Sequence, residues 1–136
     1  MLEPKKRKYR KSFRGRMKGK AYRGSKISFG ELGLKALGCA WLSSRQIEAG
    51  RRALTHSIKR GGKVWIRVFP DKPVSSRPAG QRMGGGKGDT EKYVAVITPG
   101  KIIYEVAGIE NKVMKNALER AGDKMPFKTK IVSRKD

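Results

Sequence analysis

The sequence predicts one domain that mixes short β-strands with two amphipathic α-helices, an arrangement of the α+β type. Two stretches place apolar residues at helical spacing, and glycine follows each of them. Shorter runs around these stretches alternate as strands do and are separated by Gly and Pro. The length of 136 residues fits one domain with modest extensions. We therefore expect a single domain over residues 27–136, preceded by an arm over residues 1–26.

The N-terminal arm is strongly basic. Residues 1–26 hold twelve Lys and Arg against one acid, with Tyr9, Phe13 and Tyr22 among the cations. Such a block cannot bury enough apolar surface to fold alone. It is either a solubilising tail or an arm that becomes ordered on RNA, with cations on phosphates and rings on bases. The candidate RNA-binding cations are Lys5, Lys6, Arg7, Lys8, Arg10, Lys11, Arg14, Arg16 and Lys18.

A helix is predicted after residues 27–42, which resemble short strands broken by glycine. Ser43 and Gln46 have the spacing of a capping box. The helix should extend from there to about Arg60, because Gly61 and Gly62 supply a left-handed stop.

This helix should have one apolar face and one cationic face. Ile47, Leu54 and Ile58 share a face with Gly50, at about 100° per residue. The opposite face carries charge of nearly one sign. A charged face is either simply solvated or a surface that contacts phosphate, and the total charge of the chain favours the second reading. The candidate residues of this cationic stripe are Arg45, Arg52 and Lys59, beside His56.

A strand over residues 63–69 and a long loop follow. The run KVWIRVF alternates, with Trp65, Arg67 and Phe69 on the side opposite to its aliphatic residues. The two prolines of residues 70–73 should end the strand. Residues 74–91 show no periodicity and are predicted to form a loop, which at this length is usually functional or disordered.

The rest of the chain predicts two strands, a helix and a last strand. The two strands cover residues 92–97 and 102–106 and are expected to pair, joined by a turn over residues 98–101. The helix should begin near Asn111 and end at Gly122, with an apolar stripe that packs in the core. A final strand is predicted over residues 127–132.

The charge points to a polyanionic partner. There are 34 Lys and Arg against 11 Asp and Glu, a formal charge of +23. Nucleic acid is the leading candidate and an anionic membrane surface the second. The longest clearly apolar run, Tyr93–Ile97, is far too short to span a bilayer.

Residues 89–123 have a net charge of only −1, so we expect one near-neutral side and one strongly cationic side.

The chain offers little for catalysis or metal binding. Cys39 is the only cysteine and His56 the only histidine. An intrachain disulfide is therefore impossible, and no ligand spacing typical of zinc is present. We predict no catalytic residue, no metal and no cofactor.

The stretch QRMGGGKGDT, residues 81–90, resembles a phosphate-binding loop only superficially. A P-loop needs glycine five positions before its Gly-Lys pair and Ser or Thr after the lysine, and Gln81 and Gly88 break both requirements. The loop is then either an ordinary surface turn or a flexible contact for RNA, where glycines permit close backbone approach. Its candidate contact residues are Arg77, Arg82, Met83, Gly84, Gly86, Lys87 and Gly88.

Two long motifs carry a family resemblance. GGKVWIRVFPDKP (residues 61–73) and RMGGGKG (residues 82–88) resemble the bacterial-type large-subunit ribosomal protein L-sixteen family. MLEPKKRKYRK, GRMKG, SRQIEAGRRA and KMPFKTKIV extend the resemblance over nearly the whole chain. Gly85 departs from the pattern, because many members carry a cation there. Tyr93 replaces a tryptophan found in some members.

The resemblance implies an α+β fold: a two-layer sandwich of a mostly antiparallel sheet with two helices on one face. It implies a structural constituent of the large ribosomal subunit, without catalysis, that supports late assembly. The basic arm would bind large-subunit rRNA. The loop around Arg82–Gly88 would face tRNA at the aminoacyl and peptidyl sites near the peptidyl-transferase region. Neighbouring ribosomal proteins would be partners, and neither a membrane nor a homo-oligomer is expected.

The location that the resemblance implies is a ribosome, in the bacterial cytoplasm or, alternatively, in an organelle matrix or stroma. Two other functions stay open from the residues alone. One is a nucleic-acid-condensing protein that is not a fixed ribosomal component. The other is a phosphate-handling enzyme built around the glycine loop.

Overall fold

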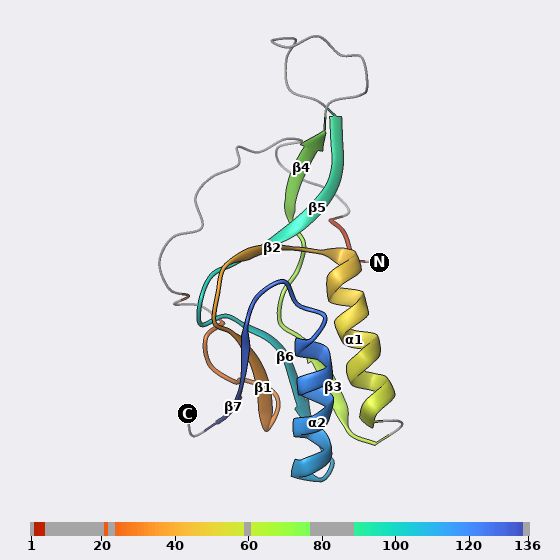
Figure 1. Ribbon diagram of the computed structural model, residues 1–136, viewed down its shortest axis with the longest axis vertical. Helices are drawn as coiled ribbons and strands as arrows, with labels where there is room; N and C mark the ends of the chain where they lie inside the picture. Colours follow the sequence, from red (N-terminus) through yellow and green to blue (C-terminus); the bar gives the residue numbers. More distant parts are fainter. Residues whose placement is uncertain (1, 5–20, 22–23, 59–60, 77–88, 135–136) are drawn as a thin grey trace.

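The computed structural model describes residues 2–4, 21, 24–58, 61–76 and 89–134, with the backbone alone at residues 75–76 and 89–91. In chain order the elements are β1 (Leu32–Ala36), β2 (Ala40–Ser43), α1 (Ser44–Ile58), β3 (Lys63–Ile66), β4 (Lys72–Ser76), β5 (Asp89–Ile97), β6 (Ile102–Ala107), α2 (Asn111–Gly122) and β7 (Thr129–Ser133). Figure 1 shows α1 and α2 lying side by side. The predicted helices are confirmed, and the first is described as far as Ile58, since residues 59–60 of its expected end lie outside the described residues.

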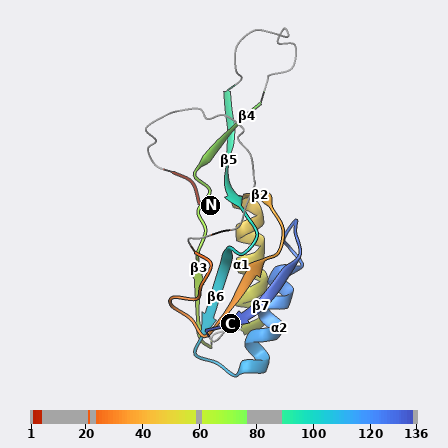
Figure 2. The same cartoon turned by 90° about the vertical axis from the view of Figure 1, so that its left-hand side faces the viewer.

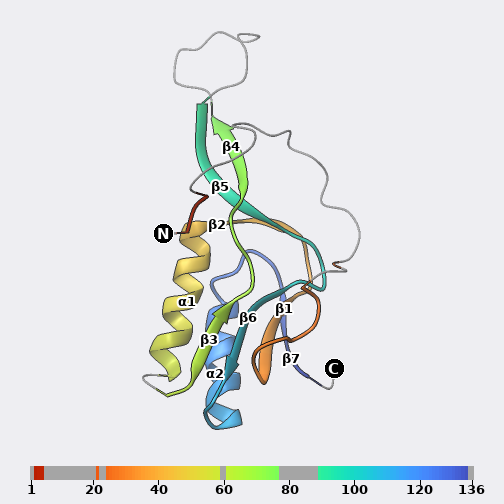
Figure 3. The ribbon, with the colours of Figure 1, turned by 180° about the vertical axis from the view of Figure 1, so that it is seen from behind.

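The described strands form two antiparallel sheets. The first has the order β3-β6-β1-β7 and the second the order β2-β5-β4. Seen from behind, the four-stranded sheet lies in front of the helices, which cover one of its faces (Figure 3). The predicted α+β class is confirmed, with the strands divided between two sheets.

Two of the connections between the sheets lie next to each other. One crossing joins β1 to β2 and the other joins β5 to β6. Gly100 N–H donates to the carbonyl of Ala36 at 2.8 Å, and Ala36 N–H donates to the carbonyl of Lys101 at 2.8 Å. The expected pairing of residues 92–97 with 102–106 is therefore wrong. Gly100 has φ of 99°, which turns the chain out of one sheet and into the other.

The strand β4 was not predicted. Its residues were expected to belong to a turn and a loop, yet they pair with β5 from Lys72 opposite Val94 to Ser76 opposite Asp89. Because β4 is an edge strand, a missing N–H on its open side costs no ladder bond, and Pro73 is tolerated there. The two strands project beyond the helices (Figure 2). The predicted loop is thus shorter, and residues 77–88 between these strands lie outside the description.

The remaining strand boundaries differ slightly from the prediction. β3 ends at Ile66 instead of residue 69, although Arg67 N–H still donates to the carbonyl of Ile103 at 2.9 Å. β7 begins at Thr129, two residues later than expected.

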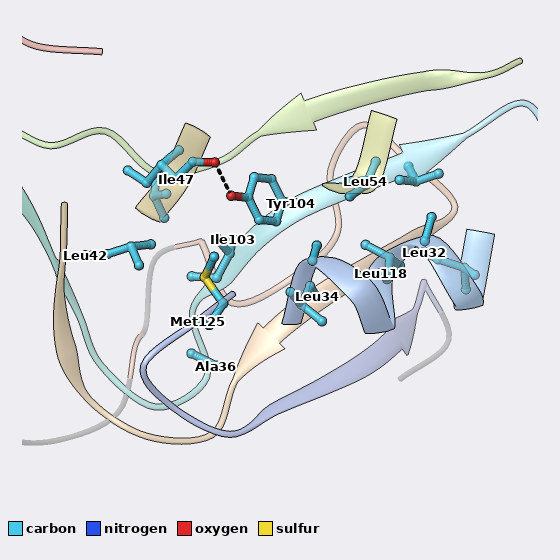
Figure 4. Packing of buried hydrophobic residues seen from close by; sticks show 14 of the residues in the cluster. Leu32, Leu34, Ala36, Leu42, Ile47, Leu54, Ile103, Tyr104, Leu118 and Met125 are labelled. Atoms are coloured by element: carbon cyan, nitrogen blue, oxygen red, sulfur yellow. Dashed lines mark hydrogen bonds between the residues drawn. The ribbon is translucent and has the colours of Figure 1, made fainter. Parts of the chain in front are cut away.

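The core lies between the helix pair and the four-stranded sheet. The predicted face of α1 is buried, with Ile47 and Leu54 at 0% exposure. Tyr104 meets this face from the sheet and Leu118 meets it from α2, while Leu34 of β1 belongs to the same core cluster (Figure 4). Burying aliphatic side chains of this size stabilises the fold by roughly 1.5–3 kcal/mol each.

The start of α1 has the predicted capping box. Gln46 N–H donates to Ser43 Oγ at 3.2 Å, and Ser43 N–H donates to Gln46 Oε1 at 3.0 Å. These two bonds satisfy donors that helix geometry leaves without partners. The first turn of α1, which carries Arg45, is therefore fixed by local sequence.

Candidate nucleic-acid interface

The cationic stripe lies on the solvent side of α1. Arg45, Arg52 and His56 are exposed, and Arg52 keeps 76% of its side chain accessible. The opposite face of the helix is buried in the core, as the spacing predicted. Lys59, the fourth predicted member, lies outside the described residues. The structure therefore presents three of the four residues along one exposed helical face.

An acid interrupts this stripe. Glu48 accepts a hydrogen bond from Arg51 Nε at 3.0 Å, and Arg52 Nε lies 3.3 Å from Glu48 Oε1. The hydrogen bond from Arg51 is the main reason that the pKa of Glu48 falls to about 2, so this carboxylate is ionised at neutral pH. Glu48 is thus an acid beside the stripe and offsets part of the charge of Arg52.

Cations of both helices line an open groove of about 1070 Å³. Arg52 and His56 come from α1, and Arg120 comes from α2. Lys124 follows α2, and Asp123 is the acid among the lining residues. Small side chains, Ala49 and Ala53 among them, also line the groove and leave room for a backbone to approach. We call this feature the interhelical groove, and its chemistry suits a chain of phosphates.

The near-neutral segment is divided among several elements. Residues 89–123 form β5 in the smaller sheet, β6 inside the larger sheet and α2 in the helix layer. The near-neutral side expected from this segment stays a prediction. One of its acids, Glu105, is fully buried.

Glu105 fixes the segment that covers the face of the larger sheet opposite the helices. Its Oε1 accepts the N–H groups of Phe29 at 2.8 Å and Gly30 at 2.7 Å, and the Ser28 N–H is 3.1 Å away. Arg67 forms an ion pair with the other carboxylate oxygen. Burial alone would raise the pKa of Glu105, but hydrogen bonds from Gly30, Arg67, Phe29 and Ser28 outweigh it and lower the pKa.

An exposed aromatic ring lies directly over this network. Phe29 is nearly parallel to Trp65, with an interplanar angle of 19° and ring centroids 6.2 Å apart. The guanidinium carbon of Arg67 lies 5.2 Å from the Phe29 centroid. Phe29 itself is 57% exposed. Aromatic and cationic side chains together are common where proteins contact unpaired nucleotides.

Comparison with known proteins gives the family of the chain. The family model described as ribosomal protein L16p/L10e matches residues 4–132. The chain belongs to this family. Similar proteins named large ribosomal subunit protein uL16c occur in Tetradesmus obliquus (59% identity), Stigeoclonium helveticum (61%) and Oedogonium cardiacum (58%). Each comparison covers 97% of this chain and 96–98% of the relative.

Membership in the L16p/L10e family confirms the resemblance inferred from the motifs. The chain is a large-subunit ribosomal protein, and the family is one of ribosomal structural proteins instead of enzymes. Within the part of the chain that the structure describes, no helix is long and apolar enough to cross a membrane. The described residues also bring together no group of three His, Cys, Asp or Glu side chains that could hold a metal ion.

Most predicted RNA contacts of this L16-family chain lie outside the described residues. This applies to the arm cations from Lys5 to Lys18 and to the loop candidates from Arg77 to Gly88. The two described ends of the arm contact the domain. Leu2 packs against the core, and Ala21 N–H donates to the carbonyl of Pro99 at 2.9 Å.

Sequence reasoning missed several residues of the two surfaces. Arg120 lies in the last turn of α2 and Lys124 is the second residue after the helix, so their closeness in sequence could have marked them as neighbours. The alternation of residues 63–69 did place Trp65 and Arg67 on one side. Phe29 carried no such signal, because its segment is irregular and reaches β3 through long-range contacts.

Proposed function

We propose that this chain binds large-subunit rRNA through the interhelical groove and the stripe of α1 and supports late assembly of the subunit. The convergence of Arg52, Arg120 and Lys124 on one groove is the observation that carries this proposal. Phosphates attract all three cations, while the small side chains of the groove allow the nucleic-acid backbone to come close. The basic arm adds further rRNA contacts.

We further propose that the loop with the motif Arg82–Gly88 contacts tRNA at the aminoacyl and peptidyl sites. The family resemblance supports this role. So does the position of the flanking strands, since β4 and β5 extend beyond the helix layer (Figure 2). A contact made at the end of these strands would be separate from the interhelical groove. The candidate tRNA-facing residues are Arg77, Arg82, Met83, Gly84, Gly86, Lys87 and Gly88.

We propose an organelle ribosome as the location. All three relatives named above are called uL16c, which supports the organelle alternative over the bacterial cytoplasm. Fractionation of the source cells tests this location. Recovery of the chain with organelle large subunits is expected, and recovery with cytoplasmic ribosomes alone would contradict it.

Salt dependence of RNA binding tests the rRNA contact. The full-length chain is titrated with an rRNA fragment at several salt concentrations, as wild type, Arg52→Gln, Arg120→Gln and Lys115→Gln. Each lost phosphate contact should reduce the slope of log affinity against log salt by about 0.7–0.9. We expect smaller slopes for the two groove variants. Lys115 is exposed on α2 and does not line the groove, so its variant should match the wild type.

Two results would contradict the proposed rRNA contact. Equal slopes for the wild type and both groove variants would exclude the groove as the phosphate-binding surface. Equal affinity for DNA and rRNA, with the chain sedimenting away from the large subunit in cell extracts, would instead favour a condensing protein.

A further inference from the structure

Phe29 is an exposed ring on a backbone that is unusually well fixed. The buried Glu105 carboxylate holds the N–H groups of Phe29 and Gly30 at 2.8 Å and 2.7 Å. Arg134 Nε donates to the carbonyl of Gly30 at 2.8 Å from the other side. A fixed apolar ring loses little conformational entropy when a partner covers it, which favours binding.

The open face of Phe29 points away from the sheet. Trp65 and Arg67 are two residues apart on an extended segment and therefore meet Phe29 from the same side. The side chain of Arg67 is only 18% exposed, whereas Phe29 is 57% exposed. Phe29 and Trp65 therefore form a platform whose outer surface is the ring of Phe29.

The charges around this platform match a nucleotide. Lys63 and Arg134 are exposed, as is the acid Glu31 of the adjoining segment. Lys63 precedes Trp65 by two residues in β3 and so lies on the same side of the strand. Arg134 donates to the carbonyls of Gly30 and Ser28, on either side of Phe29. The charge of Glu105 is met by Arg67 beneath the ring. An aromatic face with cations around it binds the base and the flanking phosphates of single-stranded RNA, while a duplex keeps its base faces stacked internally.

We propose that the Phe29–Trp65 platform stacks an unpaired RNA base, with Lys63 and Arg134 close to the adjoining phosphates. This inference rests on the proposed function, because it takes RNA as the partner. It adds a second kind of contact, since the interhelical groove reads phosphates and the platform reads the face of a base.

Two matched RNA probes test the platform. Both are the same hairpin with a short single-stranded extension, and in one probe the extension is abasic, so that the two carry equal charge. The full-length chain is measured as wild type, Phe29→Leu, Phe29→Trp and Phe69→Leu. Phe69 is a comparable control because it is 46% exposed. Thermal melting of every variant verifies that it is folded.

The wild type should bind the base-bearing probe roughly tenfold more tightly, because stacking of one base on an aromatic side chain is worth about that factor. Phe29→Leu should abolish the preference, and Phe29→Trp and Phe69→Leu should keep it. In a Trp41→Phe background, where Trp65 is the only tryptophan, the base-bearing probe should quench fluorescence more than the abasic probe.

Failure of the platform is distinguishable from failure of the proposed function. If wild type binds both probes equally and Arg52→Gln weakens both, the chain binds RNA but the platform does not stack a base. That result would assign the exposed ring to another partner, such as a neighbouring protein. If wild type binds neither probe, the proposed function and this inference both fall.

Discussion

Arg67 and Glu105 form an ion pair beneath the exposed ring of Phe29. Glu105 is fully buried and Arg67 is mostly buried, and the carboxylate also accepts backbone N–H groups from residues 28–30. Removal of one partner from such a pair leaves a buried charge without compensation. This network therefore connects the stability of the larger sheet to the position of the proposed RNA-stacking platform.

Replacing Glu105 should strongly destabilise the fold. Glu105→Gln removes the negative charge opposite Arg67 and places an NH₂ group among N–H donors. We expect a loss of about 3–5 kcal/mol in the free energy of unfolding, measured by denaturant titration. Glu119→Gln on the exposed side of α2 is the control and should stay within about 0.5 kcal/mol of wild type. Equal losses in the free energy of unfolding for the two substitutions would show that the buried ion pair does not stabilise the fold more than an exposed carboxylate does.

The same carboxylate should make stability depend on acidity. The pKa of Glu105 is lowered from its ordinary value of 4.5 in the folded state, so the unfolded state binds a proton more readily. The stabilisation is therefore complete above pH 4.5 and declines as the pH falls through the lowered pKa. Denaturant titrations from pH 7 to pH 3 should show the gap between wild type and Glu105→Gln narrowing below pH 4.5. A gap that widens in acid would contradict the lowered pKa.

Gly50 and Tyr104 should be energetically coupled. The Tyr104 hydroxyl donates to the carbonyl of Ile47 at 2.5 Å, and a Cβ at position 50 would overlap that hydroxyl and approach Met125 Cε to 2.8 Å. Gly50→Ala should therefore cost about 1–3 kcal/mol, although alanine normally favours a helix. In a double-mutant cycle, Tyr104→Phe should relieve part of that cost. Strict additivity of the two substitutions would exclude the contact.

The arm and the glycine loop should affect different steps. Deletion of residues 1–16 should weaken incorporation into the large subunit, because it removes many candidate rRNA contacts. Arg82→Ala should leave incorporation intact and mildly impair translation, because the loop would face a transient ligand. Sucrose-gradient sedimentation and an in vitro translation assay separate these effects. Impaired incorporation for Arg82→Ala with normal incorporation of the truncated chain would reverse the two roles.

Local features of this chain could be predicted and non-local ones could not. The capping box of Ser43 and Gln46 and the buried stripe of α1 depend on residues a few positions apart, and both are confirmed. The pairing partner of β5 depends on residues far along the chain. β4 was not predicted because it contains Pro73, and proline is excluded from inner strands but tolerated in an edge strand.

The candidate site shows the same division. Helical periodicity located Arg45, Arg52 and His56 on one exposed face. It did not bring Arg120 of α2 beside them, because the packing of two helices does not follow from either helix alone. Glu105 fixes the backbone of the segment that places Phe29 against Trp65, and the sequence around Glu105 is that of an ordinary strand.

Photo-crosslinking from the interhelical groove measures the central proposal most directly. A photoreactive amino acid placed at His56 is incorporated into the full chain, the large subunit is purified, and the crosslinked partner is sequenced. Docking of the groove on rRNA predicts a crosslink to a defined rRNA segment. Purified subunits in which position 56 crosslinks only to protein, or to nothing, would contradict it.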